Sequence, residues 1–217
     1  MKQKKPVWDP AVRLFHWLLV LLFIAAWATA EQGPAWMDRH MQVGYAIMTL
    51  VLFRLLWGIY GSEHARFSNF IAGPGKVLRY IRQMIGGNLE QSVGHNPLGG
   101  WSVVVMLLLI AVQSGTGLFA NDDIYNEGPL TGWVTNATSG LLTKIHKINF
   151  NLLLAIIAIH IVAVLGYLLL KKENLIKPMF TGTKYLDERQ PASHHRPWWL
   201  ALLTLLVCAA GVGWLVS

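Results

Sequence analysis

Five apolar stretches, each separated from the next by a polar segment, divide the chain into possible membrane spans. A helix needs about 20 mostly apolar residues to cross the hydrocarbon core of a bilayer. The predicted spans, in chain order, are Leu14–Ala30, His40–Tyr60, Gly99–Ala120, Ile145–Leu170 and Trp198–Val216. The pattern predicts an all-α integral membrane protein, a bundle of four helices followed by a fifth, C-terminal transmembrane helix.

The first apolar stretch has a second interpretation. Basic residues precede it, and Ala28, Thr29 and Ala30 follow it in a pattern that resembles the cleavage site of a secretory leader. Arg13 and His16, however, lie close to the apolar run, and three tryptophans fall within residues 8–27. These features favour a retained first span.

Residues 61–98 interrupt the hydropathy with glycine, proline and basic side chains. Within them, residues 77–85 (VLRYIRQMI) have apolar positions at helical spacing with arginines between them. This pattern is typical of a short amphipathic helix that lies on an anionic membrane surface. Its charges are more typical of a solvated or lipid-facing edge than of a docking site.

The charges predict how the spans are oriented. The chain carries a net charge of +7, and its basic residues lie mainly in loops beside the apolar runs. Cytoplasmic loops of membrane proteins are enriched in lysine and arginine. We therefore expect a cytoplasmic N-terminus and a periplasmic C-terminus, and this distribution gives little support to nucleic-acid binding.

A single cysteine, Cys208, limits the redox chemistry of the chain. One thiol excludes an iron–sulphur cluster, an intrachain disulfide and the CxxCH attachment site of a c-type haem. Any haem must therefore be bound without a covalent thioether. Cys208 itself lies in the middle of an apolar run, where we expect it to be a small apolar filler.

Two histidines in the fourth span, His146 and His160, suggest a cofactor function. They are fourteen residues apart, which in an α-helix is ~21 Å and almost four full turns, so both imidazoles leave nearly the same face. Ionisable side chains inside a membrane are costly and mark functional sites. One helix with histidines at two depths predicts two stacked haems.

A six-coordinate b-type haem needs two axial imidazoles, so each of these histidines needs a partner. With the N-terminus inside, His40 begins the second span at the outer surface and can meet His146. His16 begins the first span at the inner surface and is the expected partner of His160. That pairing leaves a mismatch, because His160 lies ten residues, or ~15 Å, from the inner end of its run. His95, just before the third span, is the rival of His16.

Two further residues of the second span fit a haem. Arg54 follows His40 by the same fourteen residues that separate His146 from His160, so it can meet a haem propionate at the inner site. The alternative is that Arg54 extends to the cytoplasmic surface. Gly44, one turn after His40, leaves room for a porphyrin or for a closely packed helix.

Other polar residues are weaker candidates. A quinone needs a largely dry pocket with a few polar groups, and His95, Asn96 and Gln113 could contribute to one, although capping or packing explains each. We expect the remaining histidines, His64, His194 and His195, to be solvated, with the last two able to bind a surface metal.

Four segments in one order carry a family resemblance: VWDPAVRLFHW (7–17), HMQVGYAIMTLVLFRLLWG (40–58), VGHNPLGGWSVVVMLLLIAVQSGTGLF (93–119) and IHKINFNLLLAIIAIHIVAVLGYLLLKKENLIKPMFTG (145–182). Together they resemble the bacterial cytochrome b561 family, in the group that includes the b-type cytochrome subunits of nickel–iron hydrogenases. The resemblance implies a four-helix core, two b haems and electron transfer between quinone and a redox partner in the bacterial inner membrane. The family's ligand pattern falls on His16, His40, His146 and His160. We divide the chain into a dihaem domain, residues 1–184, and a linker with an accessory helix, residues 185–217; this fifth span departs from the shortest family members.

Three functions remain open. The first is an electron-transfer subunit that links the quinone pool to a periplasmic c-type cytochrome, a hydrogenase or a dehydrogenase. The second is a stand-alone superoxide:quinone oxidoreductase, which Lys144 and Lys147 beside the outer histidine could serve by attracting superoxide. The third is a metal transporter or scaffold. Acidic residues at 122, 123 and 127 could dock a basic cytochrome. The subunit is favoured, because the chain shows no soluble domain, flavin motif or cluster.

Overall fold

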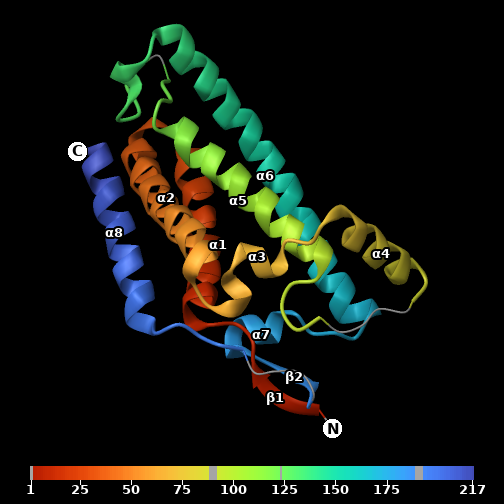
Figure 1. Ribbon diagram of the computed structural model, residues 1–217. Coiled ribbons are helices and arrows are strands. Elements are labelled where there is room, and N and C mark those ends of the chain that lie inside the picture. Colours follow the sequence, from red (N-terminus) through yellow and green to blue (C-terminus); the bar gives the residue numbers. More distant parts are fainter. Residues whose placement is uncertain (1, 88–91, 123, 189–192) are drawn as a thin grey trace.

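Five long helices dominate the computed structural model, which describes residues 2–87, 92–122, 124–188 and 193–217. They are α1 (Pro10–Glu31), α2 (Met37–Tyr60), α5 (Pro97–Gly117), α6 (Asn136–Leu170) and α8 (Trp198–Val216), as Figure 1 shows. Each has the length and apolar composition needed to cross a membrane. The all-α class and the five predicted spans are confirmed.

Two of the five long helices, α1 and α5, begin with a proline that follows a capping polar side chain. Asp9 accepts a hydrogen bond from the Val12 amide at 2.8 Å, with Pro10 in the first position of α1. Asn96 accepts one from the Gly99 amide at 2.7 Å, with Pro97 opening α5. A capping side chain satisfies one of the otherwise unpaired amides of the first turn. Both helices therefore start slightly before the apolar runs that predicted them.

The helix that contains the fourth predicted span starts nine residues before that span. Helix α6 begins at Asn136 and continues for 35 residues, or about 50 Å, well beyond the ~30 Å hydrocarbon core. Its first turns are polar because they pack on the preceding loop and not on lipid: the buried Ser139 donates to the Phe119 carbonyl at 2.8 Å. Hydropathy does not detect such residues, so the prediction missed them.

The bundle consists of two helix pairs, and the closest packing between the pairs is that of α2 on α5. Helix α1 packs along α2, α5 packs along α6, and α2 packs on α5. Leu153 of α6 is fully buried where the pairs meet, beside Ile47, Val51 and Ile110. These contacts leave α6 at one edge of the four-helix core, running obliquely to α1 (Figure 1).

Helix α8 packs against α2 on the edge of the bundle away from α6 (Figure 1). The Tyr60 and Thr204 hydroxyl groups share a hydrogen bond of 2.7 Å across this contact. Cys208 is reduced and buried there, as expected of an apolar filler. The fifth helix is therefore an integral part of the packed bundle.

A two-stranded antiparallel sheet, which the sequence did not predict, joins the start of the chain to the end of the four-helix core. Strand β1 (Lys2–Pro6) pairs with β2 (Thr183–Asp187) in the register Lys2↔Asp187 to Pro6↔Thr183. Strand β2 follows the short helix α7 (Ile176–Thr181). Because β1 precedes α1 and β2 follows α6, both ends of the core lie on the same side of the membrane. Strand β2 crosses the proposed boundary at residue 184, and the division into two domains stays a prediction.

The side that carries this sheet, here named the basic face, also carries η2 (Glu63–Ala65), α3 (Phe67–Phe70) and α4 (Pro74–Ile85) (Figure 1). Helix α4 includes the predicted surface helix. Its Tyr80 is buried, whereas Leu78 and Ile85 are exposed. The opposite face carries η1 (Pro34–Trp36), the loop 118–135 with η3 (Thr131–Trp133), and the C-terminus.

Leu186→Ala tests the attachment of the sheet to the core. The Leu186 side chain is 1% exposed, whereas Tyr185, its neighbour on the other side of β2, is 60% exposed. We expect Leu186→Ala to lower the free energy of unfolding by about 2–5 kcal/mol and Tyr185→Ala to change it by about 0.5 kcal/mol at most. Thermal unfolding of the detergent-solubilised protein, followed by circular dichroism, measures both, and equal effects would show that β2 does not pack on the core.

Candidate functional site

The histidines expected at the outer site lie together. The ring centroids of His40 and His146 are 6.3 Å apart, and the ring planes are inclined by 79°. An imidazole–metal bond is about 2 Å long, so two imidazoles on opposite sides of one metal ion have centres about 6 Å apart. The separation of His40 and His146 is thus the one that a shared iron requires.

Hydrogen bonds to two neighbouring helices determine which nitrogen of each imidazole ring is free to bind a metal. The Nδ1 atom of His40 is 2.9 Å from the Ala26 carbonyl of α1, and that of His146 is 2.9 Å from the Gln113 carbonyl of α5. A carbonyl oxygen can only accept, so each Nδ1 carries the proton. In a neutral ring the lone pair then belongs to Nε2, which is the state needed of an axial ligand.

A polar cluster on α5 and α6, which the sequence analysis did not identify as part of the site, supports His146. The buried Thr116 hydroxyl is 3.3 Å from Nδ1 of His146. Asn149, one turn further along α6 and also buried, donates to the Gln113 side chain at 2.7 Å and to the Leu109 carbonyl at 2.9 Å. A polar residue three positions after a histidine in an apolar helix was the available signal for Asn149.

Two glycines leave space around the outer pair. A Cβ atom added to Gly44 would meet nothing within 4 Å, whereas one added to Gly117 would lie 3.1 Å from Cε1 of His146. Gly117 therefore allows the close approach of α5 to the imidazole. An added Cβ at Gly44 meets open space, and the role of Gly44 beside a porphyrin stays a prediction.

The second pair, His16 and His160, is brought together less closely. The two imidazoles interact electrostatically, and Nδ1 of His16 is buried without a hydrogen-bond partner among the described residues. Helices α1 and α6, both described throughout, meet through Phe23 and Phe150, whose rings stack at 6.0 Å, and do not pack closely. Helix α6 runs obliquely to α1 (Figure 1), and a tilted helix rises less along the bundle for each residue, as the expected pairing of His16 with His160 requires.

His95 has a different environment. Its ring lies 4.7 Å from that of Trp8 and 4.5 Å from that of Phe70, and its Nδ1 is buried without a partner in the described part of the chain. Burial, together with the nearby Arg54 cation, lowers the pKa of His95 to about 3, so the ring is neutral. The electrostatic neighbours of His95 are Arg54, His64 and Lys184, and His160 is not among them.

Arg54 does not reach the surface. It is 2% exposed, and its guanidinium carbon lies 5.1 Å from the Phe67 ring and 5.9 Å from the Phe70 ring. Asp9 attracts it electrostatically, but Nη1 has no hydrogen-bond partner among the described residues. A buried donor without a partner is costly, so Nη1 remains able to donate a hydrogen bond to a carboxylate.

Two of the residues considered for a quinone site, Asn96 and Gln113, lie far apart in the structure. Gln113 is occupied by His146 and Asn149, and it lies 17 residues along from Asn96, or about 25 Å. One quinone therefore cannot contact both. His64, expected to be solvated, is partly buried beside Trp8 at a centroid distance of 6.3 Å. In the described ranges, no group of three or more His, Cys, Asp or Glu side chains could hold a metal ion.

The chain has helices that can cross a membrane, and two of them bring the histidines His40 and His146 together. This combination is typical of membrane b-type cytochromes. The family described as Prokaryotic cytochrome b561 matches residues 7–182. The chain belongs to this family, and is an integral membrane cytochrome that binds haem b and takes part in electron transfer. No curated protein and no solved structure matched in the same comparisons. Because the matching family is one of cytochromes, the interpretation as a transporter or scaffold is not considered further.

Gly117→Ala tests whether His146 depends on the close approach of α5. The new methyl group would lie 3.1 Å from Cε1 of His146, so the ring must move. We expect less haem per chain and a lower temperature of haem release in this variant than in Gly140→Ala, which changes a glycine of α6 with open space around it. Haem absorbance after purification measures the first quantity and heating measures the second; unchanged haem in Gly117→Ala would show that haem binding does not depend on the close approach of α5 to His146.

Proposed function

We propose that the chain binds two b haems along α6 and carries electrons across the inner membrane between quinone and a periplasmic redox partner. The observation that supports this proposal is that one helix carries two histidines, each of which has a histidine of another helix as a neighbour. His146 lies 6.3 Å from His40 of α2, and His160, fourteen residues further along, interacts with His16 of α1. The two sites are then offset by ~21 Å along α6, which spans most of a bilayer core.

The charges of the two faces support the proposed orientation. The described basic residues of the opposite face are Arg39, Lys144 and Lys147, whereas the basic face carries lysines or arginines on β1, α4, α7 and β2. Because cytoplasmic segments are enriched in lysine and arginine, the basic face is cytoplasmic in this proposal. The N-terminus is then cytoplasmic and the C-terminus periplasmic.

Each residue of the sites has a proposed task. Bound haem supplies a reversible one-electron couple, and the protein holds its iron with neutral imidazoles. The carbonyls of Ala26 and Gln113 keep Nε2 of His40 and His146 unprotonated. Arg54, buried with an unpartnered Nη1, balances the negative charge of a propionate at the inner site. Gly44 provides the space for the outer porphyrin.

Haem content tests the pairing. We expect the purified protein to hold two b haems per chain, His40→Ala and His146→Ala to lose the same one, and His16→Ala and His160→Ala to lose the other, because each iron needs both imidazoles. Difference spectra of reduced and oxidised protein measure this. His95→Ala is the matched control and should keep both; loss of the His160 haem in His95→Ala, with both haems kept in His16→Ala, would replace His16 by His95.

A stand-alone superoxide:quinone oxidoreductase is the second candidate, and one observation favours it. Lys144 and Lys147 are exposed on the same helix as His146, and Lys147 acts electrostatically on His146. A cationic approach could concentrate superoxide at the outer site.

The acidic loop on the same face gives limited support to docking of a basic cytochrome. The Asp122 carboxylate accepts hydrogen bonds from the Asn126 amide and side chain and from the Ile124 and Tyr125 amides, which lower its pKa below the usual range. This carboxylate therefore shapes the loop. Residue 123 lies outside the described residues, and Glu127 accepts a hydrogen bond from Asn121 at 3.4 Å.

Stopped-flow reduction of the oxidised protein discriminates the two candidates. For an electron-transfer subunit we expect quinol to reduce the haem, and superoxide to reduce it at a rate that Lys144→Gln/Lys147→Gln leaves unchanged. The matched control is Lys171→Gln/Lys172→Gln, which removes the same charge from the basic face. Rapid reduction by superoxide that is coupled to quinone turnover, and that falls about tenfold or more in the first double variant, would establish the oxidoreductase instead.

A further inference from the structure

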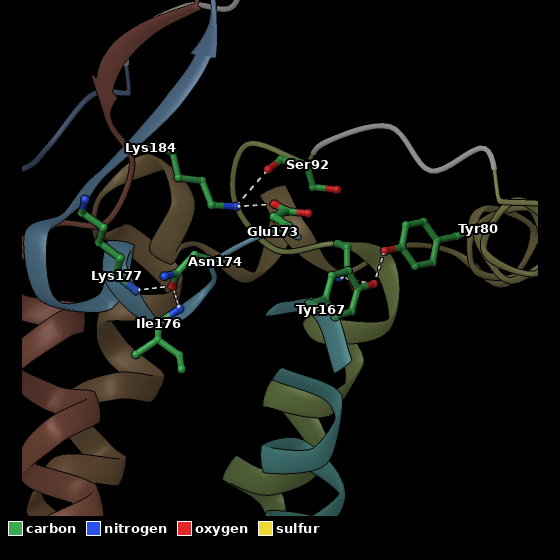
Figure 2. A network of polar contacts seen from close by, with 9 residues as sticks. Tyr80, Ser92, Tyr167, Glu173, Asn174, Ile176, Lys177 and Lys184 are labelled. Carbon is green, nitrogen blue, oxygen red and sulfur yellow. Dashed lines mark hydrogen bonds and ion pairs between the residues drawn. The ribbon is translucent and has the colours of Figure 1, made fainter. Parts of the chain in front are cut away.

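A hollow of about 560 Å³ opens on the basic face, between strands β1 and β2, the end of α6, α7 and the residues before α5. Six lysines from these separate segments line it: Lys2, Lys4, Lys171, Lys172, Lys177 and Lys184. Figure 2 shows two of them, Lys184 beside Glu173 and Lys177 beside Asn174. The hollow is therefore strongly cationic.

One acidic residue, Glu173, is present among the described residues that line the hollow, and it is already neutralised. Its carboxylate is 3.3 Å from the Lys184 ammonium, which also donates to the Ser92 carbonyl at 3.1 Å (Figure 2). The other five lysines form no ion pair within the described part of the chain. Mutual repulsion of these ammonium groups is relieved when an anion enters.

The backbone places two of these lysines on the rim. Helix α6 ends in a turn at Lys172, whose φ is 54°, a left-handed conformation that usually selects glycine or asparagine. The turn directs the Glu173 amide to the Tyr167 carbonyl at 3.0 Å. Lys171 and Lys172 are both exposed and both line the hollow.

Neutral hydrogen-bond donors complete the lining. The Tyr80 and Tyr167 hydroxyl groups share a hydrogen bond of 2.5 Å, and the Asn96 amide donates to Tyr167 at 3.1 Å (Figure 2). Whichever hydroxyl donates to the other, one proton stays free for an outside acceptor. Burial raises the pKa of Tyr80, and the bond to Tyr167 raises it further, so this pair adds no negative charge.

The position of the hollow favours a lipid as the source of the anion. Leu169 and Leu170, directly before Lys171, are 71% and 82% exposed. On α4, which carries Tyr80, Leu78 and Ile85 are also exposed. Apolar surface that faces acyl chains thus meets the cationic hollow at one place, and basic pockets beside transmembrane helices are suited to anionic headgroups.

We propose that this hollow binds the phosphate group of an acidic phospholipid, with the acyl chains beside the end of α6. The exposed ammonium groups of Lys171 and Lys172 contact the phosphate, and the tyrosine pair donates one hydrogen bond to it. The site is independent of the haem assignment, since none of its residues belongs to either histidine pair.

Native mass spectrometry of the detergent-solubilised holoprotein tests the proposal with three probes: phosphatidylglycerol, phosphatidylcholine and inorganic phosphate. We expect phosphatidylglycerol to bind more tightly than phosphatidylcholine, and Lys171→Gln/Lys172→Gln to weaken its binding by about tenfold. Lys171→Arg/Lys172→Arg should keep most of the affinity. Lys144→Gln/Lys147→Gln removes the same charge from exposed lysines of the opposite face and should leave binding unchanged.

Three results would overturn the proposal: equal affinity for the two lipids, equal losses in the two glutamine variants, or displacement of phosphatidylglycerol by millimolar inorganic phosphate that itself stays bound. The last result would assign the hollow to a soluble phosphate compound. The haem absorbance of every variant should equal that of the natural protein, which separates a lost lipid site from a lost fold. Failure of this test leaves the haem proposal intact.

Discussion

The hydrogen bond from an imidazole to a backbone carbonyl is the interaction on which the outer site depends. His40 of α2 bonds to a carbonyl of α1, and His146 of α6 bonds to a carbonyl of α5. Each histidine therefore joins the two helices of its own pair before it faces the other pair. Because the acceptors are main-chain atoms, substitution of Ala26 or Gln113 leaves the acceptor in place, so the ring orientation depends on helix packing more than on those side chains.

The same packing explains why one helix can belong to two sites. Helix α6 packs closely on α5 alone within the four-helix core, and its contact with α1 is through side chains. One face of α6 thus remains available along its length to α1 and α2. Leu153, midway between His146 and His160, fills the space between the two depths and is fully buried.

Much of this arrangement could be predicted from the sequence, because the relevant signals are local and periodic. Hydropathy predicts the spans, and the fourteen-residue spacing places His146 and His160 on one face of a helix. Depth alone predicted that His40 and His146 meet, which the structure shows, while their role as haem ligands stays a prediction. The signals that failed were of another kind. The polar first turns of α6 are helical because they pack on a loop. The strand pairing joins residues about 180 positions apart. The burial of Arg54 depends on Phe67 and Phe70, which belong to a segment with the composition of a polar loop.

The pairing of β1 with β2 also has a consequence for how the chain assembles. Strand β1 is synthesised first, yet its partner is complete only when residue 187 has been made, after α1, α2, α5 and α6. Such a distant contact forms late, because the intervening chain must be ordered before the two segments can meet. The strands can pair only if those helices have crossed the bilayer an even number of times. The small sheet can therefore close only around a core whose two ends lie on the same side of the membrane.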